Sequence, residues 1–136
     1  MKGLKNVKVY IKNVGVVTTN IGIENGKIAY IGDNAENIEP LFETDGVVLP
    51  GFIDEHIHGA GGADAMDGTV EALQTISEFV AREGTTGFLA TTMTQSPENI
   101  TSALKAVKKI REKGEYKGAE VLGVHLEGPF ISPKHV

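Results

Sequence analysis

Hydrophobic and polar residues alternate along the first part of the chain, as they do in half-buried β-strands. In residues 5–13, valine and isoleucine side chains alternate with lysine and tyrosine. Asn25 and Gly26 form a dipeptide that accepts the positive φ angles of a two-residue hairpin turn. Further short strands are predicted at residues 16–19, 21–24 and 27–31. The first 45 or so residues are therefore predicted to form a small antiparallel β unit.

The pattern changes after an acidic connector at residues 33–45. Continuous apolar runs, typical of buried strands, then alternate with segments whose apolar residues recur at helical spacing. Strands are predicted at residues 47–58, 86–92 and 121–127, and helices between them at residues 69–83 and 96–113. Thr69 and Ser96 suit the N-caps of these helices, and Gly84 and Gly114 suit their ends. The order β-α-β-α-β predicts an α/β fold with a parallel sheet.

Polar side chains gather where two of the predicted strands end. Asp54, His56 and His58 are spaced by two residues, so a regular strand would place all three on one face. The third strand repeats this spacing with His125 and Glu127, and its opposite face would carry Leu122, Val124 and Leu126. The carboxyl ends of parallel strands are where sites form in α/β proteins. Imidazole and carboxylate groups converging there can bind a divalent metal ion.

Each of these residues also has a purely structural interpretation. His56 and His58 could be a buried, hydrogen-bonded pair, and Glu127 could cap the following Gly-Pro turn. For His125, a structural hydrogen bond is favoured over metal ligation. Four acidic residues could alter the electrostatic potential of the site, but surface or turn roles are favoured for each of them. They are Asp54, Glu55, Asp64 and Asp67.

Composition excludes several other chemistries. The chain has 136 residues and no cysteine, which excludes disulfides, zinc fingers, iron-sulfur clusters and a thiol nucleophile. Residues 59–62 lack the spacing of a phosphate-binding loop. None of the serines lies in a nucleophile elbow, and they are Ser77, Ser96, Ser102 and Ser132. The net charge of −5 disfavours a nucleic-acid partner. No apolar run is long enough for a membrane helix or a signal peptide, so no membrane association and a cytoplasmic location are expected.

Three motifs resemble the N-acetylglucosamine-6-phosphate deacetylase family of the amidohydrolase superfamily. Residues 50–59, PGFIDEHIHG, resemble the first barrel strand of the superfamily, and residues 23–32, IENGKIAYIG, resemble the β unit that precedes it. Residues 125–134, HLEGPFISPK, are similar to a motif of the deacetylases and are more specific than the other two. The resemblance covers essentially the whole chain.

The resemblance implies an α/β fold of two parts. Residues 1–46 would belong to a small β-sandwich, and residues 47–136 would supply the first three βα units of a metal-dependent (β/α)₈ barrel that stays incomplete in this chain. The chain is thus expected to be the N-terminal portion of a longer enzyme, which would be cytoplasmic and a homodimer. On its own it is expected to be inactive.

The resemblance also implies a reaction and a set of ligands. The family hydrolyses the N-acetyl group of N-acetylglucosamine 6-phosphate to acetate and glucosamine 6-phosphate, using one or two divalent metal ions. By motif match, His56, His58 and Glu127 would be metal ligands. The general base, two further histidine ligands and most residues that hold the sugar phosphate would lie beyond residue 136. Zn²⁺ suits such ligands first, and Fe²⁺, Co²⁺, Ni²⁺ and Mn²⁺ are also compatible.

Two other interpretations of the sequence remain open at this stage. The protein could be a different amidohydrolase, similar to dihydroorotases or dipeptidases, or this chain could be a non-catalytic fragment. Coordinates test the metal hypothesis directly, because the side chains of His58 and Glu127 should approach within about 4–7 Å if they share one ion or two adjacent ions.

Overall fold

The computed structural model describes residues 1–132 and residue 134. Pro133 of the third motif and residues 135–136 of the expected barrel portion lie outside the described residues. The chain divides into two compact units, Met1–Pro50 and Gly51–Val136, and each is described here by itself. Across the described residues, no helix is long and apolar enough to cross a membrane.

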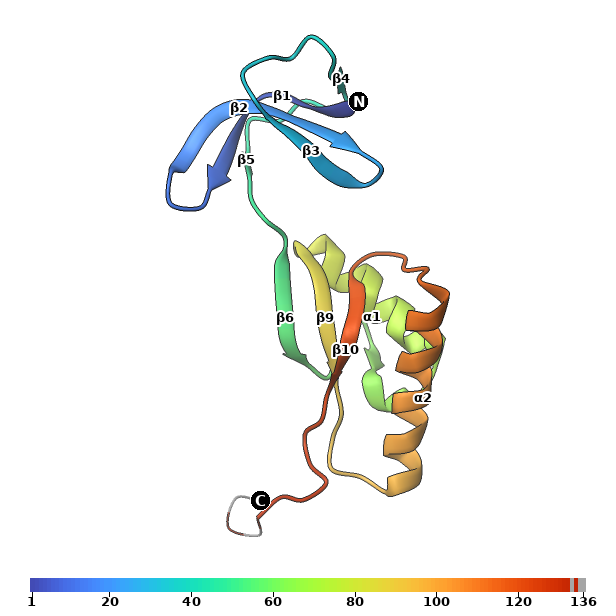
Figure 1. Cartoon of the computed structure of the whole chain (residues 1–136). Helices are drawn as coiled ribbons and strands as arrows, with labels where there is room; N and C mark the ends of the chain where they lie inside the picture. Colours follow the sequence, from blue (N-terminus) through green and yellow to red (C-terminus); the bar gives the residue numbers. More distant parts are fainter. Residues whose placement is uncertain (133, 135–136) are drawn as a thin grey trace. The chain divides into compact units, whose positions relative to one another are not determined.

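The first unit is a five-stranded sheet (Figure 1). Its strands are β1 (Lys2–Ile11), β2 (Gly15–Glu24), β3 (Lys27–Gly32), β4 (Glu39–Pro40) and β5 (Val47–Val48). β1, β2 and β3 are antiparallel, and the predicted turn joins β2 to β3 with positive φ angles at Asn25 and Gly26. One cluster of buried apolar side chains lies on β1 and β2, and its members are Leu4, Val7, Val9 and Ile21.

The strands of this unit differ from the prediction in three respects. β2 is one continuous strand where two short ones were predicted, and the acidic connector contains β4. Both β4 and β5 run parallel to β1, so the sheet is mixed rather than antiparallel. Val47 and Val48 pair with Lys8 and Val9 of β1. Because this pairing ties β5 to the first sheet, the boundary between the units falls after Pro50 and not after residue 46.

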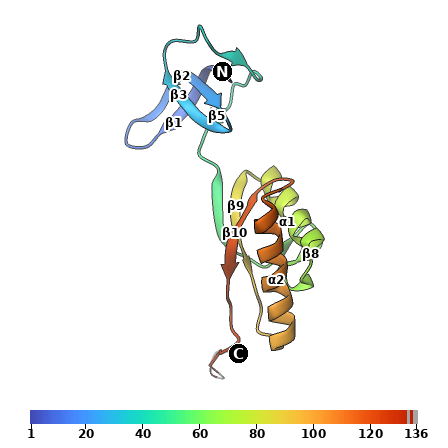
Figure 2. The same ribbon diagram turned by 45° about the vertical axis from the view of Figure 1, so that its right-hand side comes forward.

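The second unit is an α/β layer with a three-stranded parallel sheet. The strands are β6 (Phe52–Ile57), β9 (Thr85–Thr91) and β10 (Glu120–His125), in the order β10-β9-β6. The helices are α1 (Val70–Arg82) and α2 (Pro97–Lys113), which cover the same face of the sheet (Figures 1 and 2). A small hairpin, β7 (Gly59–Ala60) with β8 (Ala63–Asp64), and the short helix η1 (Ala65–Asp67) connect β6 to α1.

Both predicted helices form, and their predicted caps are present. The Thr69 hydroxyl accepts a hydrogen bond from the backbone N–H of Ala72, and the Ser96 hydroxyl accepts one from Asn99. Gly114 ends α2 in the left-handed conformation, with φ of 64°. The apolar stripes of the helices meet the sheet in one buried cluster, whose most deeply buried members are Leu73, Ile76, Phe88, Ala119, Ile110 and Val121.

The third strand of this sheet departs from regular alternation. The pairing of β10 with β9 shifts between Val121 and Gly123. As a result, Val121 and Val124 both pack toward the helices. Leu122 lies on the other face, together with Ile53. A Cβ atom added to Gly87 would point to this face, 2.9 Å from Leu122 Cδ1 and 3.3 Å from Ile53 Cδ1. The prediction that Leu122 shares a face with Val124 is therefore wrong, because a bulge changes which residues face the same way.

One buried hydroxyl joins α1 to the segment that enters β10. Ser77 is fully buried, and its Oγ donates to the carbonyl of Ala119 at 2.6 Å and accepts from the N–H of Gly118 at 3.1 Å. The Ser77 carbonyl in turn accepts from the N–H of Ala119. Since buried backbone groups need partners, this hydroxyl fixes the point at which the chain returns from α2 to the sheet.

Replacing this hydroxyl tests its contribution to stability. In Ser77→Ala, the carbonyl of Ala119 and the N–H of Gly118 lose a buried partner, so we expect the free energy of unfolding in urea to fall by about 1–3 kcal/mol. Ser102→Ala is the matched control, because Ser102 is an exposed residue within α2. Its unfolding free energy should change by no more than about 0.5 kcal/mol. Equal effects of the two substitutions would contradict this role of Ser77.

Candidate metal centre

Three side chains from two strand ends meet at the carboxyl edge of the parallel sheet. His56 Nε2 lies 2.9 Å from Glu127 Oε2, and His58 Nε2 lies 3.3 Å from the same oxygen. One donor atom from each residue lies within 4.8 Å of the other two. The separation of His58 and Glu127 is shorter than the 4–7 Å expected from the sequence. All three donors therefore converge on one point.

β6 directs the two histidines to this point through an irregular stretch. Its pairing with β9 shifts between Asp54 and Ile57. Ile57 packs against the helix-covered core, so the residues on either side of it, His56 and His58, face away from the helices. The carbonyl of His58 accepts a hydrogen bond from the N–H of Ala65 at 2.7 Å, which ties this end of the strand to the start of η1.

Glu127 lies two residues beyond the end of β10, where the sequence predicted that the strand would still continue. Its position depends on Thr92, which follows β9 and is buried. The Thr92 N–H donates to the carbonyl of His125 at 3.0 Å, and the Thr92 hydroxyl accepts from the N–H of Glu127 at 3.3 Å. Thr92 was not among the site residues predicted from the sequence. Its position as the last residue of the predicted strand 86–92, at the edge where sites form, was the available signal.

The chemistry of these donors fits a divalent metal ion. Ligand atoms at about 2.0–2.1 Å from a tetrahedral ion lie about 3.3 Å from one another, close to the two separations measured to Glu127. Both histidines present Nε2 to the carboxylate. His58 Nδ1 is buried and has no hydrogen-bond partner among the described residues. About half of the His56 side chain is exposed, so one side of the cluster is open to water.

The third histidine of interest, His125, is not one of these three donors. Its Nδ1 lies 3.0 Å from the backbone carbonyl of Glu55, and its ring centroid lies 4.5 Å from that of His56. The structure thus gives His125 a hydrogen bond across the sheet.

The acidic residues near the site make local backbone contacts. Asp54 pairs in register with Phe88 of the helix-covered core. It therefore does not share a face with His56, and the prediction that it would is wrong. Its carboxylate accepts from the N–H of His56 at 3.0 Å. Asp64 and Asp67 form a capping box at η1, and the Glu55 side chain is exposed. The register shift in β6 separates Asp54 from the two histidines.

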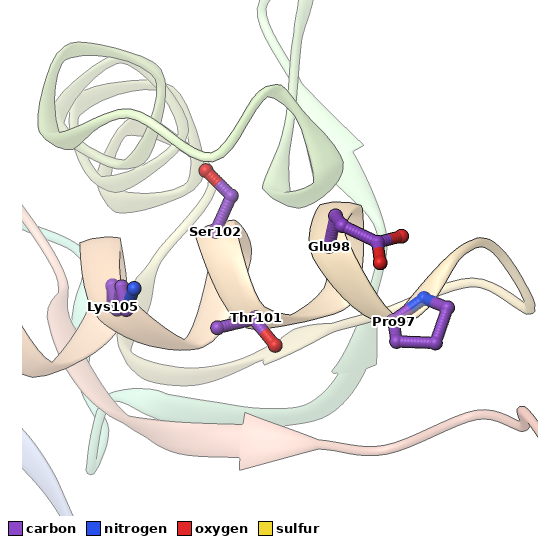
Figure 3. A pocket seen from close by; sticks show the side chains of 5 residues that line it. All are labelled: Pro97, Glu98, Thr101, Ser102 and Lys105. Carbon is purple, nitrogen blue, oxygen red and sulfur yellow. The ribbon is translucent and has the colours of Figure 1, made fainter.

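A surface hollow on α2 is separate from this cluster. It is lined by Pro97, Glu98, Thr101, Ser102 and Lys105 (Figure 3). All five residues belong to the first turns of one helix and are exposed. Because no second element contributes to it, this hollow does not bring convergent polar groups together as a substrate site does.

Comparisons with known proteins identify the family of the chain. A profile of the amidohydrolase family matches residues 47–135. The N-acetylglucosamine-6-phosphate deacetylase of Bacillus subtilis is 44% identical over 138 residues, which cover 91% of this chain and 35% of the relative. The N-acetylgalactosamine-6-phosphate deacetylase of Escherichia coli O157:H7 is 39% identical over 103 residues, covering 72% of this chain and 27% of the relative.

A solved structure is similar over nearly the whole chain. The N-acetylglucosamine-6-phosphate deacetylase of Thermotoga maritima matches with a TM-score of 0.78 and 37% identity, over 97% of this chain and 33% of that protein. This chain spans about a third or less of the length of each of these relatives. The family profile covers more than half of the chain and includes His56, His58 and Glu127. The chain therefore belongs to the amidohydrolase family.

Proposed function

We propose that His56, His58 and Glu127 bind a divalent metal ion in a hydrolytic site. The observation that carries this proposal is the approach of both Nε2 atoms to the same carboxylate oxygen, at 2.9 and 3.3 Å. These separations favour a single ion shared by the three residues over two ions held separately. Zn²⁺ is the ion that best suits two imidazoles and a carboxylate, and Fe²⁺, Co²⁺, Ni²⁺ and Mn²⁺ are compatible.

Each side chain has a distinct part in this site. When bound, a divalent ion activates water near neutral pH and polarises an amide carbonyl. His56 and His58 contribute neutral imidazoles, and Glu127 contributes one negative charge, so the loaded site keeps a net positive charge that attracts a carbonyl oxygen. Thr92 holds the backbone of Glu127, and the start of η1 holds the backbone of His58. About half of the His56 side chain is exposed among the described residues, and we propose that water and substrate approach from this side.

For the whole protein we propose deacetylation of N-acetylglucosamine 6-phosphate to glucosamine 6-phosphate and acetate. The names and identities of the Bacillus and Thermotoga relatives support this reaction. The proposal includes a cytoplasmic homodimer with a closed (β/α)₈ barrel, of which β6, β9 and β10 are the first three strands. It also places the general base and the phosphate-binding residues in later strands of that barrel.

A second sugar phosphate is a specific alternative. The Escherichia coli relative is named for N-acetylgalactosamine 6-phosphate, which differs from the glucosamine substrate in the orientation of one hydroxyl group. The metal cluster described here acts on the N-acetyl group, which the two sugars share. The choice between them therefore depends on residues that contact the sugar ring.

Metal content tests the ligand assignment. In the full-length protein purified without chelators, we expect the double variant His56→Gln, His58→Asn and the single variant Glu127→Gln to contain fewer metal equivalents than the wild type by elemental analysis. Removing a residue that only holds a metal ligand in place weakens metal binding by roughly 10–100-fold. Removing a ligand itself should therefore raise the apparent metal Kd by more than this. Glu120→Gln, at the opposite end of β10 and exposed, should retain wild-type metal content. An unchanged count in the double variant would remove both histidines from the site.

Acetate release tests the proposed reaction. We expect the full-length enzyme to release acetate from N-acetylglucosamine 6-phosphate faster than from N-acetylgalactosamine 6-phosphate, and to leave dihydroorotate and β-aspartyl dipeptides intact. Chelation should abolish the activity and added Zn²⁺ should restore it. Glu127→Gln should lower kcat/KM by about 100-fold or more, because a metal contributes several kcal/mol to the transition state. Turnover of dihydroorotate or a dipeptide alone would contradict the proposal.

A further inference from the structure

We infer that His125 is a positioning residue for the metal centre, which fixes the irregular stretch of β6 that carries His56. The inference rests on the proposed function, because it concerns the geometry of the same metal site. It assigns His125 a task distinct from that of the three donor residues. The contacts that carry it are the hydrogen bond to the Glu55 carbonyl and the contact between the rings of His125 and His56.

The hydrogen bond reaches the point where β6 loses its regular pairing. Asp54 pairs with Phe88 and Ile57 pairs with Ala90, and the shift in register lies between them. Two residues of β6, Glu55 and His56, therefore lie opposite one residue of β9, Leu89, which is the arrangement of a β-bulge. A bulge leaves backbone groups unpaired and redirects the neighbouring side chain. The Glu55 carbonyl lies inside this span, and His56 is the side chain that is redirected.

His125 is held so that it can reach this carbonyl. It pairs in register with Thr91 of β9, and its own carbonyl accepts from the Thr92 N–H at 3.0 Å. β9 lies between β10 and β6, so the His125 side chain must pass over β9 to contact Glu55. The residue beside it on β9 is Thr91, whose side chain is short. Since a carbonyl can only accept, His125 Nδ1 is the ring nitrogen that carries the proton.

The ring of His125 also limits the orientation of His56. The two ring centroids lie 4.5 Å apart at an interplanar angle of 45°, and the His58 ring lies 5.2 Å from that of His56 on an edge. Glu127 also contacts His56, so these two rings and the carboxylate each restrict its rotation. Without His125, both the backbone and the ring of His56 would lose a contact.

Metal affinity and coordination geometry test this role in the full-length protein. We would measure the Co²⁺ Kd by competition with a chelator, and the visible absorption of bound Co²⁺, in wild type, His125→Ala and His125→Asn. We expect His125→Ala to raise the Kd by roughly 10–100-fold and to change the spectrum while the Co²⁺ stoichiometry at saturation stays at the wild-type value. Asn can place an N–H near the position of Nδ1, so His125→Asn should recover most of the affinity and of the spectrum.

Thr86→Val is the matched control. Thr86 is on β9, and its hydroxyl donates to the carbonyl of Phe52, so it too makes a side-chain hydrogen bond to the backbone of β6, at the end distant from the cluster. We expect Thr86→Val to leave the Co²⁺ Kd and spectrum unchanged. Circular dichroism checks that each variant is folded.

Three outcomes would overturn the inference. Wild-type affinity and spectrum in His125→Ala would show that the residue does not position the site. Loss of a whole metal equivalent in His125→Ala would make it a ligand. Equal weakening in the Ala and Asn variants would show that the hydrogen bond is not the cause. None of these measurements requires substrate, so they distinguish an error about His125 from an error about the proposed reaction.

Discussion

Burial of a few apolar side chains against α1 and α2 determines which residues of the parallel sheet are available for chemistry. Ile57, Phe88 and Val124 come from three different strands, and each is drawn toward the helices by the free energy of removing apolar surface from water. In a strand, neighbouring residues face opposite sides, so burying one residue exposes the next on the other face. His56, His58 and His125 are such neighbours, and their placement is a consequence of core packing.

The sequence predicted the elements whose signals are local. α1 and α2 form with the caps at Thr69 and Ser96, because a hydroxyl before an apolar periodic segment satisfies a backbone N–H within three residues. The hairpin at Asn25 and Gly26 is local in the same way. The convergence of His56, His58 and Glu127 was also predictable, since the ends of parallel strands share an edge and the spacing of the histidines places them on one face.

What the sequence could not predict depends on contacts between distant residues. The bulge in β10 lets Val121 and Val124 both pack toward the helices, which a period of two would prevent, and a second bulge lies in β6 between Asp54 and Ile57. Each bulge changes which residues share a face. Asp54 and Leu122 were assigned to the wrong faces for this reason. The pairing of β5 with β1 joins residues far apart in sequence, and nothing within Val47 or Val48 indicates which sheet they enter. Thr92 acts through its hydroxyl on Glu127, which follows another strand.

The three donor residues of the metal cluster all lie between His56 and Glu127, in the second unit of the chain. Ribosomes deliver residues in order, and N-terminal segments begin to fold first. Bringing these donors together closes loops only within β6, β9, β10 and their two helices, and the entropy cost of closing a loop grows with its length. The convergence of the donors thus needs only contacts within this one stretch of the nascent chain, so it can precede the synthesis of anything that follows.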